Sequence, residues 1–309
     1  MSSDLPAGFE KVRCPLGCQI GDERILVASD RILGNPGRFQ IVRCLQCGLM
    51  RTTPRPSKEI ITGFYHDNYG PYKKSASTVR VGGWRKAIGQ WLQQDPRRTP
   101  PISPGRLLEI GCANGAWLEE MSRRGWTCDG IELSSTAAMD ARSRGLHVQE
   151  GLIEDVTPRH RHYDAIAAWM VLEHLHDPVS SLSRLATWTQ PGDWLILSVP
   201  DAKWETRLYG SRGYALHLPH HMFHFTPATL AKVLRASGWS LRHIHWQRNA
   251  ANLLLSISNF FADARHQRTA AYIRGIADGN RLRACRALLA GILGATRFSG
   301  RITVWARRV

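Results

Sequence analysis

The sequence lacks a long apolar run, since no stretch approaches the roughly 20 apolar residues that a membrane-spanning helix needs. Its first ten residues, MSSDLPAGFE, also lack the apolar core of a secretory signal. We therefore expect a cytoplasmic protein. In that reducing compartment its seven cysteines should be free thiols or metal ligands, and not disulfides.

Acidic residues are scarce in this sequence. The 309 residues include 25 Asp or Glu against 41 Lys or Arg, which gives a formal net charge of +16. Such an excess favours an anionic partner, for example nucleic acid, anionic lipid or a phosphorylated substrate. It would equally follow from an arginine-rich proteome, so the charge by itself leaves the partner open.

Four of the seven cysteines form two close pairs near the N-terminus. They are Cys14-Pro-Leu-Gly-Cys18 and Cys44-Leu-Gln-Cys47-Gly, and the segment between them alternates as short strands do. Four thiolates make the closed tetrahedral shell of a structural zinc site, which leaves no position open for catalysis. Residues 1–53 are therefore predicted to form a small zinc ribbon. The alternative is four reduced thiols without a metal.

The sequence also lacks the two commonest phosphate-binding loops. Residues 106–117, RLLEIGCANGAW, place a glycine turn between a short apolar strand and an amphipathic helix. The spacing is not G-x-G-x-x-G, and no Gly-Lys-Ser/Thr follows. Gly111 and Gly115 let the backbone approach a ligand at a helix N-terminus, which suits a polar or negatively charged group.

From residue 105 onward, short apolar runs alternate with amphipathic stretches, which predicts a parallel α/β sheet. Glu132 ends the second strand, where an acid can accept hydrogen bonds from both hydroxyls of a ribose. Residues 54–104 are predicted to be a linker and a helical cap or arm, with the proline-rich segment 52–57 as the linker. The main domain then covers residues 105–309, with an insertion at about 248–300.

An ordered set of motifs carries a resemblance to a known family. The set is LLEIGCANG, IELS, YDAI…VLEHLHDP, PGDWLILSVP and FTPATLAKVLRASGW. It resembles class I S-adenosylmethionine-dependent methyltransferases, above all the type-23 and ubiquinone-biosynthesis-like groups, some of which carry an N-terminal zinc-binding segment. The resemblance implies a Rossmann-like sheet of seven strands with the last one antiparallel. It also implies S-adenosylmethionine at the carboxyl ends of the first strands.

The same resemblance implies which residues hold this cofactor. Its methionine part would be surrounded by Glu109, Gly111, Cys112, Asn114 and Gly115. Glu132 would bind its ribose. Leu133, Leu152 and Ile153 would border its adenine, and Met170 and Val171 would lie near its sulfonium.

A histidine-rich segment, HLPHHMFHF at residues 217–225, should lie on the face where a methyl acceptor sits. His221 and His224 are candidates for the general base that a hydroxyl or carbon acid needs. Sugar C-methyltransferases have a Tyr-His-Glu-His stretch here, with the last histidine as base. His221 matches that position, but Leu218 replaces the tyrosine and His220 the glutamate. The histidines could instead be structural or bind a metal, although no acidic cluster accompanies them in the sequence.

The insertion at 248–300 is predicted to form two apolar helices separated by an arginine-rich stretch. From Arg242 to Val309 the chain carries twelve Arg or Lys and two Asp. Apolar faces edged by arginine suit an anionic membrane surface, so peripheral contact at the inner membrane is one expectation. Packing on the domain's own core or on a dimer partner is the other, and the oligomeric state stays open.

These features together predict a methyltransferase that acts at a hydroxyl oxygen of a small-molecule, sugar or lipid-linked glycan acceptor, with a histidine as general base. Three alternatives are a sugar C-methyltransferase, an RNA or DNA methyltransferase, and a non-catalytic zinc-containing scaffold. The sequence lacks the Asn/Asp-Pro-Pro-aromatic motif and the Pro-Cys pair of nucleic-acid enzymes. Its intact glycine turn and Glu132 argue against the scaffold.

Overall fold

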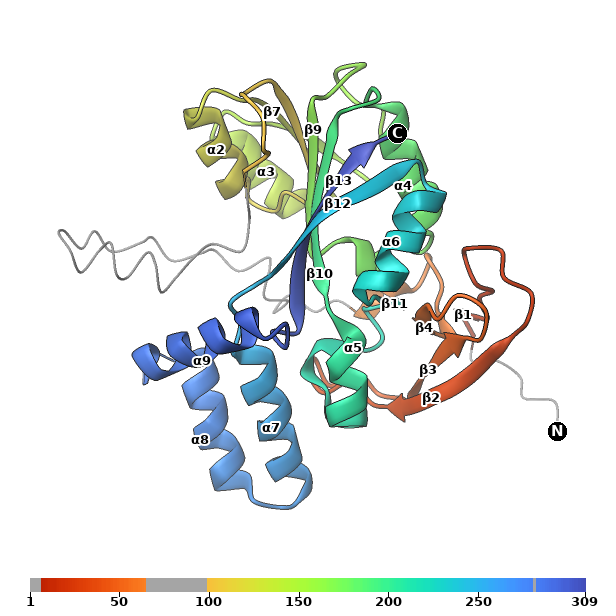
Figure 1. The fold of residues 1–309 in the computed structure, drawn as a ribbon, viewed down its shortest axis with the longest axis vertical. Coiled ribbons are helices and arrows are strands. Elements are labelled where there is room, and N and C mark those ends of the chain that lie inside the picture. Colours follow the sequence, from red (N-terminus) through yellow and green to blue (C-terminus); the bar gives the residue numbers. More distant parts are fainter. Residues whose placement is uncertain (1–6, 65–98, 280–281) are drawn as a thin grey trace.

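The computed structural model describes residues 7–64, 99–279 and 282–309, and a seven-stranded sheet lies at its centre (Figure 1). The strand order is β8-β7-β6-β9-β10-β13-β12, and β13 runs antiparallel to both of its neighbours. The predicted Rossmann-like sheet with an antiparallel last strand is confirmed. Its strands are β6 (Arg106–Ile110), β7 (Thr127–Glu132), β8 (His147–Glu150), β9 (Ala165–Trp169), β10 (Trp194–Pro200), β12 (Trp239–Trp246) and β13 (Arg301–Arg308).

Helices cover both faces of this sheet, which is why its central strands are apolar on both sides. In β6, Leu108 and Ile110 pack into one core, whereas Leu107 packs into the other. In Figure 1, α2 and α3 lie on one side of the sheet and α4 and α6 on the other. These helices are α2 (Ala116–Arg123), α3 (Ser135–Ser143), α4 (Pro178–Thr187) and α6 (Pro227–Ala236).

The N-terminal segment forms a four-stranded sheet in the order β11-β4-β3-β2, and β11 comes from the histidine-rich segment far along the chain. Three residues of the predicted linker 52–57 lie in strands: Thr52 ends β4, and residues 55 and 56 pair with β1. Most of the predicted arm, residues 65–98, lies outside the described residues, and the domain limits stay predictions. The strands are β1 (Phe9–Glu10), β2 (Asp22–Ala28), β3 (Phe39–Cys44), β4 (Met50–Thr52), β5 (Arg55–Pro56) and β11 (Phe223–His224).

Short helical turns connect these parts. One follows the N-terminal strands, one follows β9, and four lie between β10 and β11. They are η1 (Ile61–Phe64), η3 (Leu172–His174), α5 (Ala202–Trp204), η4 (Glu205–Tyr209), η5 (Gly210–Arg212) and η6 (Tyr214–Leu216).

In its described residues the insertion contains both predicted helices, α7 (Ala251–Asp263) and α9 (Arg283–Ala295), and a third one between them, α8 (Gln267–Asp278); they project away from the sheet (Figure 1). The stretch read from the sequence as an arginine-rich separator is largely α8. This helix packs along α7, where Ser258 donates a hydrogen bond to the Ala270 carbonyl at 2.8 Å. Among the described residues, none of the helices combines the length and the apolar character needed to cross a bilayer.

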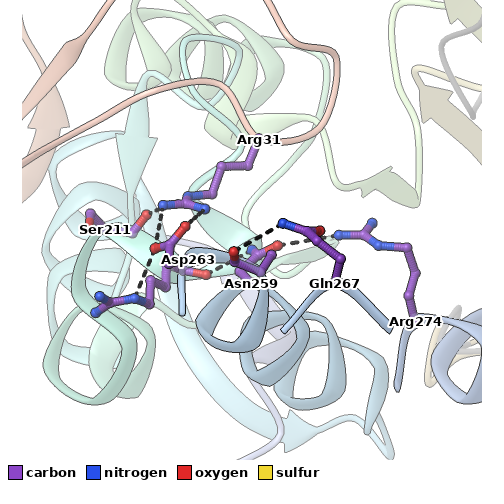
Figure 2. A network of polar contacts seen from close by, with 8 residues as sticks. Arg31, Ser211, Asn259, Asp263, Gln267 and Arg274 are labelled. Carbon is purple, nitrogen blue, oxygen red and sulfur yellow. Dashed lines mark hydrogen bonds and ion pairs between the residues drawn. The ribbon is translucent and has the colours of Figure 1, made fainter. Parts of the chain in front are cut away.

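An arginine links the N-terminal segment to the insertion. Both terminal nitrogens of Arg31 donate to the Asp263 carboxylate at 2.9 Å, and its Nε donates to the Ser211 carbonyl at 3.1 Å (Figure 2). Arg212 donates to the same carboxylate at 3.0 Å. Asp263 therefore ties α7 to two other parts of the chain.

Candidate active site

The glycine turn between β6 and α2 bends through three residues with positive φ, namely Gly111 (67°), Ala113 (48°) and Gly115 (74°). A Cβ on Gly111 would lie 2.7 Å from a Val171 methyl group, and one on Gly115 would lie 2.3 Å from a Leu146 methyl group. Both positions thus require glycine for space as well as for conformation. The turn consequently presents bare backbone at the start of α2.

Glu132 lies at the carboxyl end of β7 and is bonded directly to this turn. Its Oε2 accepts a hydrogen bond from the Ala113 amide at 2.7 Å, and its Oε1 accepts one from the Ser134 amide at 2.8 Å. Each carboxylate oxygen keeps a second lone pair, so the group can also accept bonds from a ligand. The Glu132 carboxylate thereby fixes the conformation of the turn and lies next to it.

The remaining residues predicted around the cofactor's methionine part differ in their exposure. Glu109 is buried within β6, and Asn114 accepts a hydrogen bond from the Ala116 amide at 3.3 Å. Burial raises the pKa of the Cys112 thiol, and the nearby charges of Glu109 and Glu132 raise it further. Cys112 is therefore a packed neutral thiol and not a nucleophile.

The residues predicted at the adenine lie beyond β7 and β8. Leu133 and Leu152 are partly exposed, and the Gly151 amide donates to the Glu132 carbonyl at 3.0 Å, which brings the two strand ends together. Exposed leucines at this edge supply an apolar surface next to Glu132. Ile153, in contrast, is buried in the core with Ile110 and faces away from solvent.

A left-handed residue directs the chain from β9 toward the glycine turn. Met170 has φ 57°, and its amide donates to the Ser198 carbonyl at 3.0 Å. Val171 then packs against Gly111, and η3 follows at once. Glu173 and His174 therefore follow directly after the residue that contacts the glycine turn.

Four histidines gather at the end of η3, namely His174 of η3 itself and His217, His220 and His221. Ring centroids of His174 and His221 lie 4.8 Å apart, those of His217 and His221 lie 4.9 Å apart, and those of His217 and His220 lie 4.7 Å apart. His220 and His221 are buried, and burial lowers the pKa of the His221 ring well below its usual 6.5. The His221 ring is consequently neutral at pH 7.

Backbone carbonyls determine which nitrogen of each ring carries the proton. His221 Nδ1 lies 2.8 Å from the Ala215 carbonyl, and His174 Nδ1 lies 3.1 Å from the His220 carbonyl. Because a carbonyl can only accept, these Nδ1 atoms must be the donors. In a neutral His221 ring the Nε2 atom is then the proton acceptor.

Glu173 is the acid that faces this nitrogen. Its side chain is fully buried, and Oε1 lies 4.0 Å from His221 Nε2. Burial raises the pKa of this carboxyl to about 8. Donor atoms of Glu173, His174 and His221 lie within 4.8 Å of one another, a set that would also suit a divalent cation. Glu173 was not predicted from the sequence, because it precedes His221 by 48 residues and no local motif joins the two.

His224 has a different environment from His221. It lies in β11, and its Nε2 is 3.1 Å from the Thr52 hydroxyl of the N-terminal sheet. Burial lowers the pKa of this ring to about 3. The structure therefore separates the two predicted bases, since His221 faces Glu173 and His224 contacts the N-terminal segment.

The four predicted zinc ligands converge. The sulfurs of Cys14, Cys18, Cys44 and Cys47 all lie within 4.8 Å of one another, and those of Cys14 and Cys47 are 3.5 Å apart. Zinc–sulfur bonds of about 2.3 Å would place tetrahedral sulfurs about 3.8 Å apart. The Leu49 amide points at Cys47 Sγ at 3.4 Å, as a cysteine knuckle requires. The donor set therefore fits Zn²⁺.

Comparisons with known proteins agree with this architecture. A family model described as a methyltransferase domain matches residues 84–244, just over half of the chain. The chain is 28% identical over 158 residues to a ubiquinone biosynthesis O-methyltransferase from Albidiferax ferrireducens, and 30% identical over 152 residues to one from Thiobacillus denitrificans. These matches cover 46% and 45% of this chain and 63% and 66% of the relatives.

Solved structures of the same kind are also similar. A methyltransferase from Mesorhizobium loti aligns with a TM-score of 0.46 at 14% identity, over 68% of this chain and 94% of the other. The matches cover less than two thirds of the length of the two curated relatives named above.

The family model, in contrast, covers more than half of this chain. On the evidence of that model and of the strand order, the chain belongs to the class I S-adenosylmethionine-dependent methyltransferases.

Proposed function

We propose that this protein transfers the methyl group of S-adenosylmethionine to a hydroxyl oxygen of a small-molecule, sugar or lipid-linked glycan acceptor, with His221 as general base. One observation carries the proposal. The Nε2 atom of the buried His221 ring, unprotonated because Nδ1 donates to the Ala215 carbonyl, lies 4.0 Å from Glu173 of η3. Val171, the residue before η3, packs against Gly111 of the glycine turn. The O-methyltransferase names of the relatives support an oxygen acceptor.

The glycine turn would hold the cofactor's amino-acid end. Glu132 would bind the ribose hydroxyls, while Leu133 and Leu152 would border the adenine. Met170 and Val171 would lie near the sulfonium. When bound there, S-adenosylmethionine supplies an electrophilic methyl group. The chain's part is then to align an acceptor oxygen with that methyl group, because in-line displacement depends mainly on position.

His221 would remove the acceptor proton. Its Nε2 takes the hydroxyl proton while the oxygen forms its bond to the methyl carbon and the carbon–sulfur bond breaks. The products are a methyl ether, S-adenosylhomocysteine and a protonated imidazole. The Glu173 carboxyl, 4.0 Å from Nε2, would be the polar group beside that imidazolium.

Replacing Glu132 by alanine should weaken binding of S-adenosylhomocysteine at least tenfold. The variant loses the proposed ribose contact and both hydrogen bonds that shape the turn. Each hydrogen bond to a charged group contributes about 1.5–3 kcal/mol, so a tenfold loss of affinity is the least that we expect. Isothermal calorimetry measures this change. Glu150→Ala, at the end of the neighbouring β8 and exposed, is the matched control and should bind like the wild type. If Glu132→Ala bound S-adenosylhomocysteine as tightly as the wild type, the proposed binding of the ribose by Glu132 would be wrong.

We also propose that α9 contacts an anionic membrane surface, which would bring a lipid-linked acceptor to the enzyme. Its exposed side carries the apolar stripe Cys285, Leu288, Ile292 and Ala295, with spacings of three or four residues. The excess of arginine in the insertion supports an anionic surface. Its Asp263 does not offset that positive charge outward, because it is paired with Arg31 (Figure 2) and also with Arg212. Exposed leucine and isoleucine among arginines suit interfacial binding.

Vesicle sedimentation tests the membrane contact. At low salt the protein should sediment with vesicles containing phosphatidylglycerol and not with pure phosphatidylcholine vesicles. Leu288→Glu combined with Ile292→Glu should abolish sedimentation, because both side chains are more than half exposed and the fold does not need them. Leu208→Glu, an equally exposed leucine on η4, is the control. Absence of wild-type sedimentation would rule the contact out.

A further inference from the structure

The N-terminal cysteine segment and the histidine segment share one β-sheet. Strand β11 pairs antiparallel with β4, so that Phe223 lies opposite Arg51 and His224 opposite Met50. The Thr52 amide extends the ladder by donating to the Met222 carbonyl at 2.9 Å. The backbone that carries the proposed base is therefore held from outside the methyltransferase sheet.

The Thr52 hydroxyl contacts two of these histidines at once. It lies 2.8 Å from the His221 carbonyl and 3.1 Å from His224 Nε2, and Thr52 is completely buried. A hydroxyl has one proton, and the His221 carbonyl can only accept it. Thr52 therefore donates to His221 and accepts from His224, which must carry its proton on Nε2.

Thr52 is also close to the four cysteines along the chain. Strand β4 begins three residues after Cys47, and Leu49 lies between them, completely buried. The Cys44 amide donates to the Leu49 carbonyl at 3.0 Å, while Lys232 of α6 donates to the Cys47 carbonyl at 2.8 Å. A metal on the four sulfurs would thus hold the start of β4 against the methyltransferase domain.

We propose that Thr52 is a positioning residue of the acceptor site, through which the four-cysteine segment holds the His221 backbone and the His224 ring in place. The inference rests on the proposed function, since it gives His221 the role of base. On this account the N-terminal segment is a structural part of the active site and not a separate binding module. The Thr52 hydroxyl positions the residues on the methyl-acceptor side of the site, and not those proposed to bind the cofactor.

Thr52→Val and Thr52→Ser test this role. Valine keeps the shape of threonine without the hydroxyl, so kcat for methyl transfer should fall about tenfold or more, as a displaced base predicts. Serine should restore kcat to within about twofold of the wild type. Affinity for S-adenosylhomocysteine and bound zinc should stay the same in both variants. If valine prevents folding, Thr52→Ala removes the hydroxyl without adding volume. An unchanged kcat without the hydroxyl overturns the proposal.

A nitrogen-15 spectrum of the histidine rings gives a readout that does not depend on activity. In the wild type, His224 should appear as the Nε2–H tautomer, its signal being identified by its loss in His224→Gln. Thr52→Val should shift that signal, while Thr52→Ser should keep it. A proton on Nδ1 of His224 in the wild type overturns the proposal. If the tautomer is as expected but His221→Gln keeps full activity, the proposed function fails and the Thr52 contact stands.

Discussion

His221→Gln should lower kcat for methyl transfer about a hundredfold or more, because general base catalysis contributes 10² to 10⁴. Glutamine occupies a similar volume but cannot take a proton from the acceptor at neutral pH. Affinity for S-adenosylhomocysteine should change less than about twofold, since the ring contacts η3 and not the glycine turn. Transfer of a labelled methyl group and calorimetry on the same preparation separate the two effects.

His243→Gln provides the control for this experiment. His243 is an exposed histidine on β12, where its ring packs against Trp305. Its replacement should leave both kcat and cofactor affinity unchanged. If His221→Gln retained wild-type kcat, the base would have to lie elsewhere, and Glu173 would be the next group to replace because it is the acid beside the same site.

Cys47→Ser should remove zinc from the protein and lower its Tm by about 10 °C. Zinc contributes a large part of the folding free energy of small cysteine domains, and a domain of this size loses about 2–4 °C per kcal/mol. Metal analysis should find one zinc per wild-type chain and almost none in the variant. Methyl transfer should also be lost, because β4 supports β11 through backbone pairing.

Cys285→Ser is the matched control for zinc removal. Cys285 is exposed on α9, far along the chain from the four clustered cysteines. Its replacement should change neither the zinc content nor the Tm. Wild-type protein that is purified without zinc, yet melts like zinc-loaded protein, would contradict a structural metal and favour four reduced thiols.

Local patterns in the sequence predict most of the sheet and its helices. Asp177 and Thr226 each accept a hydrogen bond from a helix amide, with proline at the first turn, as those residue pairs indicate. The predictions from the sequence place an arginine-rich separator where α8 forms, although Ala270, Ile273 and Ala277 recur there at helical spacing. They also omit β5 and β11, since a two-residue strand has no periodicity and exists only through its partner.

The residues of the candidate site also fall into those that a local pattern predicts and those that only the fold brings together. The glycine turn and Glu132 belong to one local strand–turn–helix pattern and its neighbour, so the sequence identifies them. The contact between Glu173 and His221 joins residues 48 positions apart, and that between Thr52 and His224 joins residues 172 apart. Only the fold brings such residues together, and no spacing rule predicts them.

A crystal structure of the protein with S-adenosylhomocysteine tests the central claim most directly. The account predicts the ribose hydroxyls on Glu132, the amino-acid end over the Gly111 turn, and the sulfur directed toward Met170 with His221 Nε2 across an open acceptor space. S-adenosylhomocysteine bound away from Glu132, or with its sulfur directed away from His221, would contradict the account.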